Sequence, residues 1–252
     1  MTRTFIAALI IVMTAGVLPA QRPGPQGQAD RDRARTYNRL GWEALRSEKY
    51  DEAIRSFRDA IDLRPDYEYA YYGLGRAHLA SRQYVQAIAA LEKCRDLYRA
   101  QGSKQFSSIQ DVQRFRQDRI MEIDEQIRML NSARPTVATQ DLVRQYETVR
   151  RDLEEAVRRD TGLTIDASVP SWVSLSLGSA YFRSSRLLDA EREYKEAIAG
   201  NAKLGEAHSN LAVVYLETER YKEAAEAISA AKKTGFKINP ELERAIQSRL
   251  KP

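Results

Sequence analysis

The stretch YNRLGWEALRSEKYDEAIRSFRDAIDLRP, residues 37–65, decides how this chain folds. It recurs 34 residues later, over residues 71–99, as YYGLGRAHLASRQYVQAIAALEKCRDLYR. The matched positions are Tyr37 and Tyr71, Leu40 and Leu74, Gly41 and Gly75, Ala53 and Ala87, Phe57 and Leu91, Ala60 and Cys94, and Pro65 and Arg99. Self-similarity at a fixed period of this length indicates a repeat architecture.

The physical basis of the pattern is the packing of two helices. Leu40 and Gly41 lie on a predicted first helix, where the missing side chain lets a second helix approach closely. Ala53, Phe57 and Ala60 lie at helical spacing on that second helix and present small and large volumes in turn. One such hairpin cannot cover its own apolar face, but stacked neighbours can.

The pattern returns twice more, which gives four predicted repeats over residues 34–67, 68–101, 171–204 and 205–238. The matching residues are Leu177, Gly178, Tyr181, Ala190, Tyr194 and Ala197, and then Leu211, Ala212, Tyr215, Ala224, Ile228 and Ala231.

The order Leu-Gly, Ala-x-x-x-Phe and Pro at this period resembles the signature of the tetratricopeptide repeat (TPR) family. The later repeats depart from it in places: Ala202 and Phe236, like Arg99, stand in the place of Pro65, and Ala212 replaces the glycine. These departures concern the tightness of turns and not the fold. The resemblance covers a little over half of the chain and implies an all-α, right-handed α-solenoid of helical hairpins.

The central segment, residues 102–170, lacks the signature but carries two apolar stripes at helical spacing. The stripes are Ile120, Ile123, Ile127 and Leu130, and then Leu142, Tyr146, Val149, Leu153 and Ala156. We therefore expect two long helices that form an antiparallel hairpin. Two interpretations stay open, a pair of diverged repeats with lengthened helices or an inserted arm that self-associates.

The C-terminal segment, residues 239–252, is predicted to be a capping helix. Asn239 suits the N-cap, Pro240 the first helical position, and Glu241 the positive end of the helix dipole. Its apolar stripe, Leu242, Ala245, Ile246 and Leu250, would cover the last repeat.

The N-terminus has the layout of a secretory signal peptide. Arg3 precedes an uncharged, mainly apolar run over residues 5–18, which ends at Pro19-Ala20. The run is shorter than the roughly 20 residues that span a bilayer. We therefore predict a cleaved signal over residues 1–20, a flexible linker over residues 21–33, and a periplasmic or secreted protein. The alternative is an uncleaved anchor facing the periplasm, which would be the expected membrane contact.

The composition excludes several classes of protein. The 252 residues are 30% charged with a formal net charge of +5, and Asp and Glu are interleaved with Lys and Arg, so a nucleic-acid partner is not expected. The single cysteine, Cys94, cannot form an internal disulfide and is predicted to be a buried apolar residue. His78 and His208 have no second ligand at metal spacing, and no phosphate loop or nucleophile motif occurs. We expect no enzyme, metal site or cofactor.

The TPR resemblance implies that the first helices of the repeats line a concave, peptide-binding face. The residues it assigns to partner binding are Arg35, Asn38, Trp42, Arg46, Tyr69, Tyr72, Arg76, Trp172, Phe182 and Arg183. Aromatic and arginine side chains dominate the set, and both are enriched at binding hot spots. Trp42 and Gly73 stand where the family's two-carboxylate clamp has asparagine, so that mode of recognition is not expected. The alternative is that Trp42 and Trp172 pack against a neighbouring repeat or the central hairpin.

Two functional hypotheses follow. The first is a scaffold or adaptor in the cell envelope, an exported bacterial-type TPR protein that holds a protein or peptide in its concave groove. The second is a structural component that forms homo-oligomers through the central hairpin, whose stripes resemble heptads.

Overall fold

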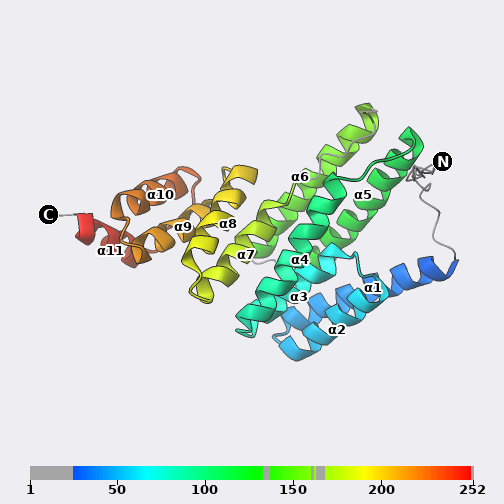
Figure 1. Ribbon diagram of the computed structural model, residues 1–252, viewed down its shortest axis with the longest axis horizontal. Coiled ribbons are helices and arrows are strands. Elements are labelled where there is room, and N and C mark those ends of the chain that lie inside the picture. Colours follow the sequence, from blue (N-terminus) through cyan, green and yellow to red (C-terminus); the bar gives the residue numbers. More distant parts are fainter. Residues whose placement is uncertain (1–24, 133–136, 160–161, 163–167, 251–252) are drawn as a thin grey trace, which may run out of the picture.

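The computed structural model describes residues 25–132, 137–159, 162 and 168–250. In these residues the chain forms α-helices and no strand (Figure 1). The helices are α1 (Pro25–Arg46), α2 (Tyr50–Leu63), α3 (Glu68–Ala80), α4 (Tyr84–Gly102), α5 (Ile109–Asn131), α6 (Val137–Arg159), α7 (Ser171–Arg183), α8 (Leu187–Gly200), α9 (Gly205–Glu217), α10 (Tyr221–Lys233) and α11 (Pro240–Leu250). The predicted all-α solenoid of helical hairpins is confirmed.

The four repeats are the helix pairs α1–α2, α3–α4, α7–α8 and α9–α10, and each is closed by one small-to-large contact. A Cβ added to Gly41 would stand 2.7 Å from the ring of Phe57, and one added to Gly178 would stand 2.7 Å from the ring of Tyr194. A side chain at either glycine would therefore collide with the second helix. In the fourth repeat Ala212 replaces the glycine, and the smaller Ile228 stands at the place of the ring.

Each repeat also turns between its two helices in the same way. Glu48, Arg82, Ser185 and Glu219 have positive φ angles of 58°, 62°, 62° and 59°. The N–H that follows each of them reaches back five residues, as in the 3.0 Å bond from Lys49 to the carbonyl of Ala44. This left-handed helix end is normally made by glycine, yet all four repeats make it without one.

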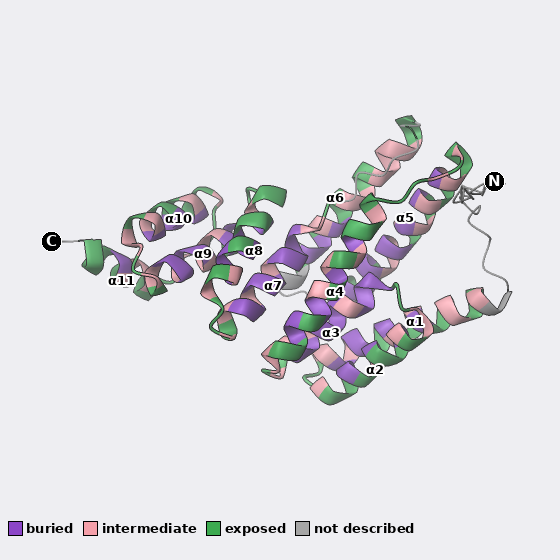
Figure 2. Cartoon of the chain, in the orientation of Figure 1, coloured by how far each residue is buried: buried purple, intermediate pink, exposed green. Residues whose placement is uncertain are grey.

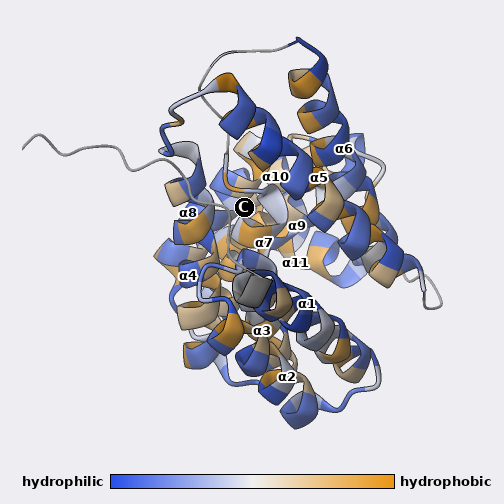
Figure 3. Ribbon diagram, turned by 90° about the vertical axis from the view of Figure 1, so that its right-hand side faces the viewer, coloured by the Kyte–Doolittle hydropathy of each residue, from blue (hydrophilic) through white to orange (hydrophobic). Residues whose placement is uncertain are grey.

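The stack of repeats passes directly from α4 to α7, and α5 with α6 leaves it (Figure 1). The hydroxyl of Tyr181 in α7 donates to Glu92 in α4 at 2.5 Å, and Arg95 in α4 forms a 2.8 Å ion pair with Glu193 in α8. Of the two interpretations of the central segment, this packing favours an arm inserted between the second and third repeats. Viewed along the stack, the arm lies beside α1 and α3 (Figure 3).

The N-terminal prediction is wrong for residues 25–33, which are part of α1 and not of a linker. Ion pairs one helical turn apart support this extension: Arg33 lies 3.5 Å from Asp30, and Arg35 lies 3.1 Å from Asp32. The predicted signal peptide, residues 1–20, lies outside the described residues. Within the described part of the chain, no helix has both the length and the apolarity needed to cross a bilayer.

At the other end, α11 packs against α10. The side chain of Asn239 accepts a 2.9 Å hydrogen bond from the N–H of Glu241, as an N-cap does, and Ile246 is buried. Leu250, predicted to share that stripe, is exposed.

Gly178→Ala should lower the free energy of unfolding by about 1 kcal/mol, because overpacking costs about 1–3 kcal/mol and better helix propensity returns about 1 kcal/mol. The loss should be smaller when Tyr194→Ile is also present, because that pair reproduces Ala212 and Ile228 of the fourth repeat. A double-mutant cycle by urea unfolding measures this coupling. Strict additivity would contradict the contact.

Ser185→Gly should raise the free energy of unfolding by about 0.5–1 kcal/mol, because a non-glycine residue is strained in this conformation. Ser184→Gly is the control: its φ is −95°, so glycine there relieves no strain. It adds conformational entropy to the unfolded chain, removes the 2.9 Å hydrogen bond that the Ser184 hydroxyl donates to the carbonyl of Tyr181, and should not stabilise. Equal thermal unfolding curves for the two variants would refute the argument.

Candidate interaction surface

The inner face of α1 is covered by α5. The side-chain amide of Asn38 donates to that of Gln126 at 3.3 Å, and Arg46 donates to the backbone carbonyl of Met129 at 3.1 Å. Arg35 lies 3.7 Å from a carboxylate oxygen of Glu125. Asn38 is 1% exposed, so this part of the predicted groove is closed by the chain itself. Helix α1 carries buried stretches, drawn in purple, beside exposed ones (Figure 2).

Aromatic rings continue the covered face into α3 and α7. The ring of Tyr146 in α6 lies 5.9 Å from that of Tyr69 and 4.9 Å from that of Trp172, both edge-to-face. Trp42 packs against Phe57 at 5.6 Å and against Tyr72 at 6.0 Å. Such pairs contribute about 0.5–1.5 kcal/mol beyond the area that they bury.

Tyr72 also connects the second repeat with the third. Its hydroxyl lies 3.4 Å from the Oγ of Ser176 in α7 and accepts a 3.1 Å hydrogen bond from Arg76. Interaction with Tyr72 raises the pKa of the Arg76 guanidinium, so this residue stays charged.

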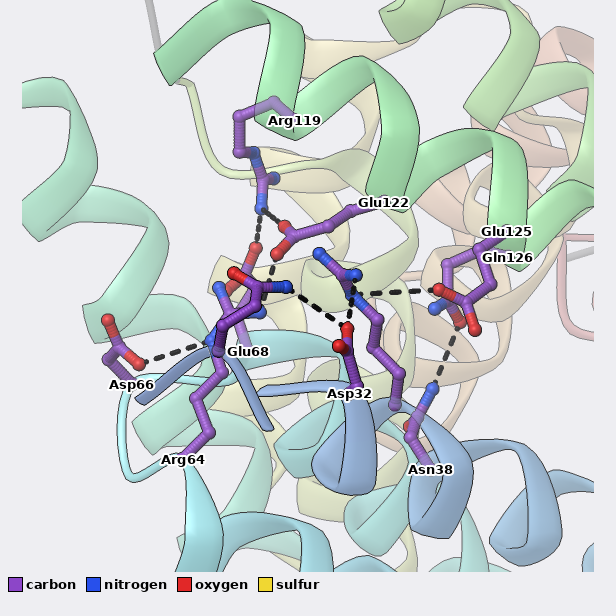
Figure 4. Close-up of polar contacts among 11 residues, drawn as sticks. Asp32, Asn38, Arg64, Asp66, Glu68, Arg119, Glu122, Glu125 and Gln126 are labelled. Carbon is purple, nitrogen blue, oxygen red and sulfur yellow. Dashed lines mark hydrogen bonds and ion pairs between the residues drawn. The ribbon is translucent and has the colours of Figure 1, made fainter. Parts of the chain in front are cut away.

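Four charged side chains join α5 to the start of α3 (Figure 4). Arg119 pairs with Glu68 and, at 3.2 Å, with Glu122, which pairs in turn with Arg64. The guanidinium of Arg119 also lies 5.1 Å from the centre of the Tyr69 ring. Two positive and two negative groups therefore balance inside the protein.

Burial acts to raise the pKa of the Glu122 carboxyl, but the guanidinium groups of Arg64 and Arg119 outweigh it and hold that pKa below its ordinary value. Glu122 is therefore ionised at neutral pH, as both ion pairs require.

The ten predicted binding residues thus divide into three groups. Asn38, Trp42, Tyr69, Tyr72 and Trp172 are buried, while Arg35, Arg46 and Arg76 are partly exposed. Trp42 packs within the first two repeats and Trp172 against the hairpin, as the alternative reading of the sequence proposed. Phe182 is half-buried and Arg183 exposed, on a part of α7 beyond the hairpin contacts named above.

Sequence reasoning did not find the charged cluster of Arg64, Glu68, Arg119 and Glu122. One signal existed: Glu68 opens the second repeat, where the other repeats have the small residues Ala34, Ser171 and Gly205. A carboxylate at a buried small-residue position needs a cationic partner.

The inner face of the last two repeats carries apolar side chains that are only partly covered. Leu175 and Phe182 of α7 and Val213 and Leu216 of α9 are half-buried, and Arg183, which follows Phe182, is exposed. Leu175, Phe182 and Leu216 also pack in part against the core. The helices that pack closely against α9 are α7, α8 and α10, all members of the stack.

Two of the three groups considered for chemistry, His78 and Cys94, are enclosed, whereas His208 is partly exposed and its Nε2 lies 3.1 Å from the carbonyl of Ala202. His78 is 2% exposed and its Nδ1 lies 2.8 Å from the side-chain oxygen of Gln83, and burial lowers its pKa. Burial raises the pKa of the Cys94 thiol far above its ordinary value, so the thiol is not a nucleophile at neutral pH. Among the described residues, no cluster of three or more His, Cys, Asp or Glu side chains is arranged so that it could hold a metal ion.

The family model described as "Tetratricopeptide repeat" matches residues 38–101 and 175–237, together half of the chain. A cell division cycle protein 27 homolog of Caenorhabditis elegans is 38% identical over 66 residues, 26% of this chain and 8% of that protein. The chloroplastic tetratricopeptide repeat domain-containing protein PYG7 of Arabidopsis thaliana is 36% identical over 64 residues, 25% of this chain and 21% of that protein. The chain therefore spans only a small part of either relative.

Among solved structures, MamA (41-end) from Desulfovibrio magneticus RS-1 is 18% identical, with 85% of this chain and 97% of that chain covered. The TM-score is 0.30, which is too low to support an inference about function.

Glu122→Gln should lower the free energy of unfolding at pH 7 by about 3–5 kcal/mol, because it breaks a buried ion pair. The pKa of Glu122 is lowered on folding, so its contribution is present above the ordinary carboxyl range and is lost as the pH falls through the folded pKa. The difference in stability between wild type and variant in urea unfolding should therefore shrink as the pH falls below the ordinary carboxyl range.

Glu155→Gln is the control, because Glu155 is 42% exposed and pairs only across one turn with Arg159. That change should cost at most about 0.5 kcal/mol. If the two variants lose the same stability at pH 7, the buried cluster does not hold the hairpin.

Proposed function

The chain belongs to the tetratricopeptide repeat family, and from this premise we propose that it is a scaffold that holds a partner protein on the inner face of its repeats. Family members of this architecture are in general interaction scaffolds rather than enzymes. The observation that carries the proposal is the half-buried apolar surface of α7 and α9, formed by Leu175, Phe182, Val213 and Leu216 with Arg183 beside it.

The chemistry of that surface suits a peptide or helix with apolar anchors and an acidic residue. Phe182 and Leu216 would accept the apolar side chains, and Arg183 would pair with a carboxylate. Arg35, Arg46 and Arg76, at the edge of the covered face, remain candidates for contacts with the same partner. The signal-like residues 1–20 support an envelope location, periplasmic or secreted, with a retained anchor as the alternative.

The alternative function, homo-oligomerisation through the hairpin, depends on the apolar stripes of α5 and α6. These stripes pack against other parts of the same chain. Ile123, Ile127 and Leu130 of α5 and Leu142 and Tyr146 of α6 are all in the buried core. Few of these side chains are exposed to a second copy of the chain, so we propose the scaffold, and not the homo-oligomer, as the function.

Site-specific photo-crosslinking in the native host tests the scaffold. A photoreactive residue at Phe182 or Leu216 should give a crosslinked partner, and one at Leu188, which is 80% exposed on α8, should not. Phe182→Ala with Arg183→Glu should reduce recovery of that partner at least about tenfold, the loss expected for one hot-spot residue.

Trp42→Ala is a poor test of the same idea. Trp42 is 6% exposed and lies in the core, so its truncation would cost about 3–5 kcal/mol of stability whatever the protein binds. The scaffold proposal fails if the crosslink patterns from positions 182, 216 and 188 are identical.

A further inference from the structure

Helix α5 lies on the inner face of the first two repeats in the manner of a bound ligand. Arg119, Glu122, Gln126 and Met129 follow at three- and four-residue steps, which places them on one side of the helix. Arg119 forms an ion pair with Glu68, and Glu122 forms one with Arg64. Gln126 accepts a hydrogen bond from Asn38, and the backbone carbonyl of Met129 accepts one from Arg46. Residues of α1, of α3 and of the turn before α3 therefore contact one face of α5.

The surface that contacts α5, formed by α1, α3 and the turn before α3, is called the wall below. The hydrogen bonding of its described polar groups is incomplete. Among the described residues, four buried polar atoms of this surface find no hydrogen-bond partner: Oδ1 of Asn38, Nε1 of Trp42, the hydroxyl of Tyr67 and Oε2 of Glu68. All four residues are at most 6% exposed. Each unpaired buried atom weakens the association by about tenfold or more relative to a ligand that would pair it. Helix α5 is thus an imperfect occupant of this face.

The backbone of the hairpin approaches the first two repeats less closely than successive repeats approach one another, although Ile123, Ile127 and Tyr146 lie in the core that the hairpin shares with the repeats. The close backbone approaches between successive helices of the stack do not recur between α5 and α1 or α3, where long side chains make the contact. The ion pairs at this contact favour specificity more than affinity, because their desolvation offsets the attraction. A tethered segment can remain bound despite weak contacts, since its effective concentration is in the millimolar range.

Removal of the hairpin need not dismantle the stack. Helix α7 packs on α4 directly, with the Tyr181–Glu92 hydrogen bond and the Arg95–Glu193 ion pair between repeats two and three. Residues 103–108 alone separate α5 from α4.

We propose that the inner face of α1 and α3 is a docking groove for an amphipathic helix of a partner protein, and that α5 is its built-in competitor. The partner helix carries a basic residue facing Glu68 and an acidic residue three positions later facing Arg64. It also carries amide or hydroxyl side chains that reach Nε1 of Trp42 and Oδ1 of Asn38. The inference rests on the proposed function only in treating the chain as a scaffold, and it concerns a different surface from Phe182 and Leu216.

The test uses a fluorescent peptide with the sequence of residues 109–131 and the full-length chain. Arg119→Ala/Glu122→Ala/Gln126→Ala loosens α5 and leaves the wall intact, so it should bind the peptide at least about tenfold more tightly than wild type. The matched control, Gln117→Ala/Met121→Ala/Arg128→Ala, alters exposed residues of the same helix and should bind as wild type does. Adding Asn38→Ala and Glu68→Ala to the loosened chain should abolish binding.

Two further measurements guard against simple misfolding. Amide hydrogen exchange in α8 and α10 should be unchanged in the loosened variant. In wild type, saturating peptide should speed exchange in α6 and leave α1 and α3 protected. A peptide in which the residue equivalent to Arg119 is changed to glutamate should bind at least about tenfold more weakly.

Equal affinity of the peptide for wild type, the loosened chain and the control would overturn the proposal. So would a loosened chain that exchanges hairpins with a second copy and binds no peptide, because the groove would then accept only the hairpin of its own kind. Neither outcome bears on crosslinking at Phe182, so failure here is distinct from failure of the scaffold.

Discussion

The fold depends on the contact between a small residue on the first helix of each repeat and a large one on the second. Gly41 with Phe57, Gly75 with Leu91 and Gly178 with Tyr194 bring the two helices so close that a Cβ on the glycine would overlap the opposing side chain. This distance sets the width of every hairpin and hence the surface offered to the next one. Because all repeats share it, the stack continues from α4 to α7 even though 68 residues, 103–170, intervene in the sequence.

The junction at which the hairpin leaves the stack differs chemically from the other two. Arg95 and Glu193 form an ion pair there, whereas the equivalent positions are Ile61 with Ala90 and Ile198 with Ala227. A buried ion pair adds little net stability compared with apolar packing, but it penalises every wrong partner strongly. At the one junction whose repeats are not adjacent in the sequence, this pair favours the packing of the third repeat on the second over alternative registers.

The repeats could be predicted from the sequence because their information is local and periodic. Gly41 and Phe57 define the close approach of the two helices of a hairpin within 17 residues, and the same spacing of a small and a large residue recurs in all four repeats. Leu40, part of the same motif, is exposed in the structure. The course of the hairpin could not be predicted in this way. The stripe of Ile123, Ile127 and Leu130 shows that α5 has an apolar face, but not which surface that face meets, and Arg119 is 51 residues from the Glu68 that it contacts. The extension of α1 was missed because Pro and Gly near its start suggested a linker, whereas the residues from Asp30 onwards favour a helix.

The candidate site, like the fold, could be predicted from the sequence only in part. The family resemblance assigned Asn38, Trp42, Tyr69 and Trp172 to one inner face. In the structure Asn38 contacts Gln126 of α5, and Tyr69 and Trp172 contact Tyr146 of α6, whereas Trp42 packs against Phe57 and Tyr72. The resemblance could not reveal that the chain supplies its own occupant. An uncovered inner face would expose Trp42, Tyr69 and Trp172 as an apolar patch, which in a soluble protein promotes aggregation. A purely apolar hairpin would remove that patch but hold almost irreversibly. Pairing through Arg119 and Glu122 covers the rings at a modest net gain in stability, because the desolvation of the charges offsets much of their attraction.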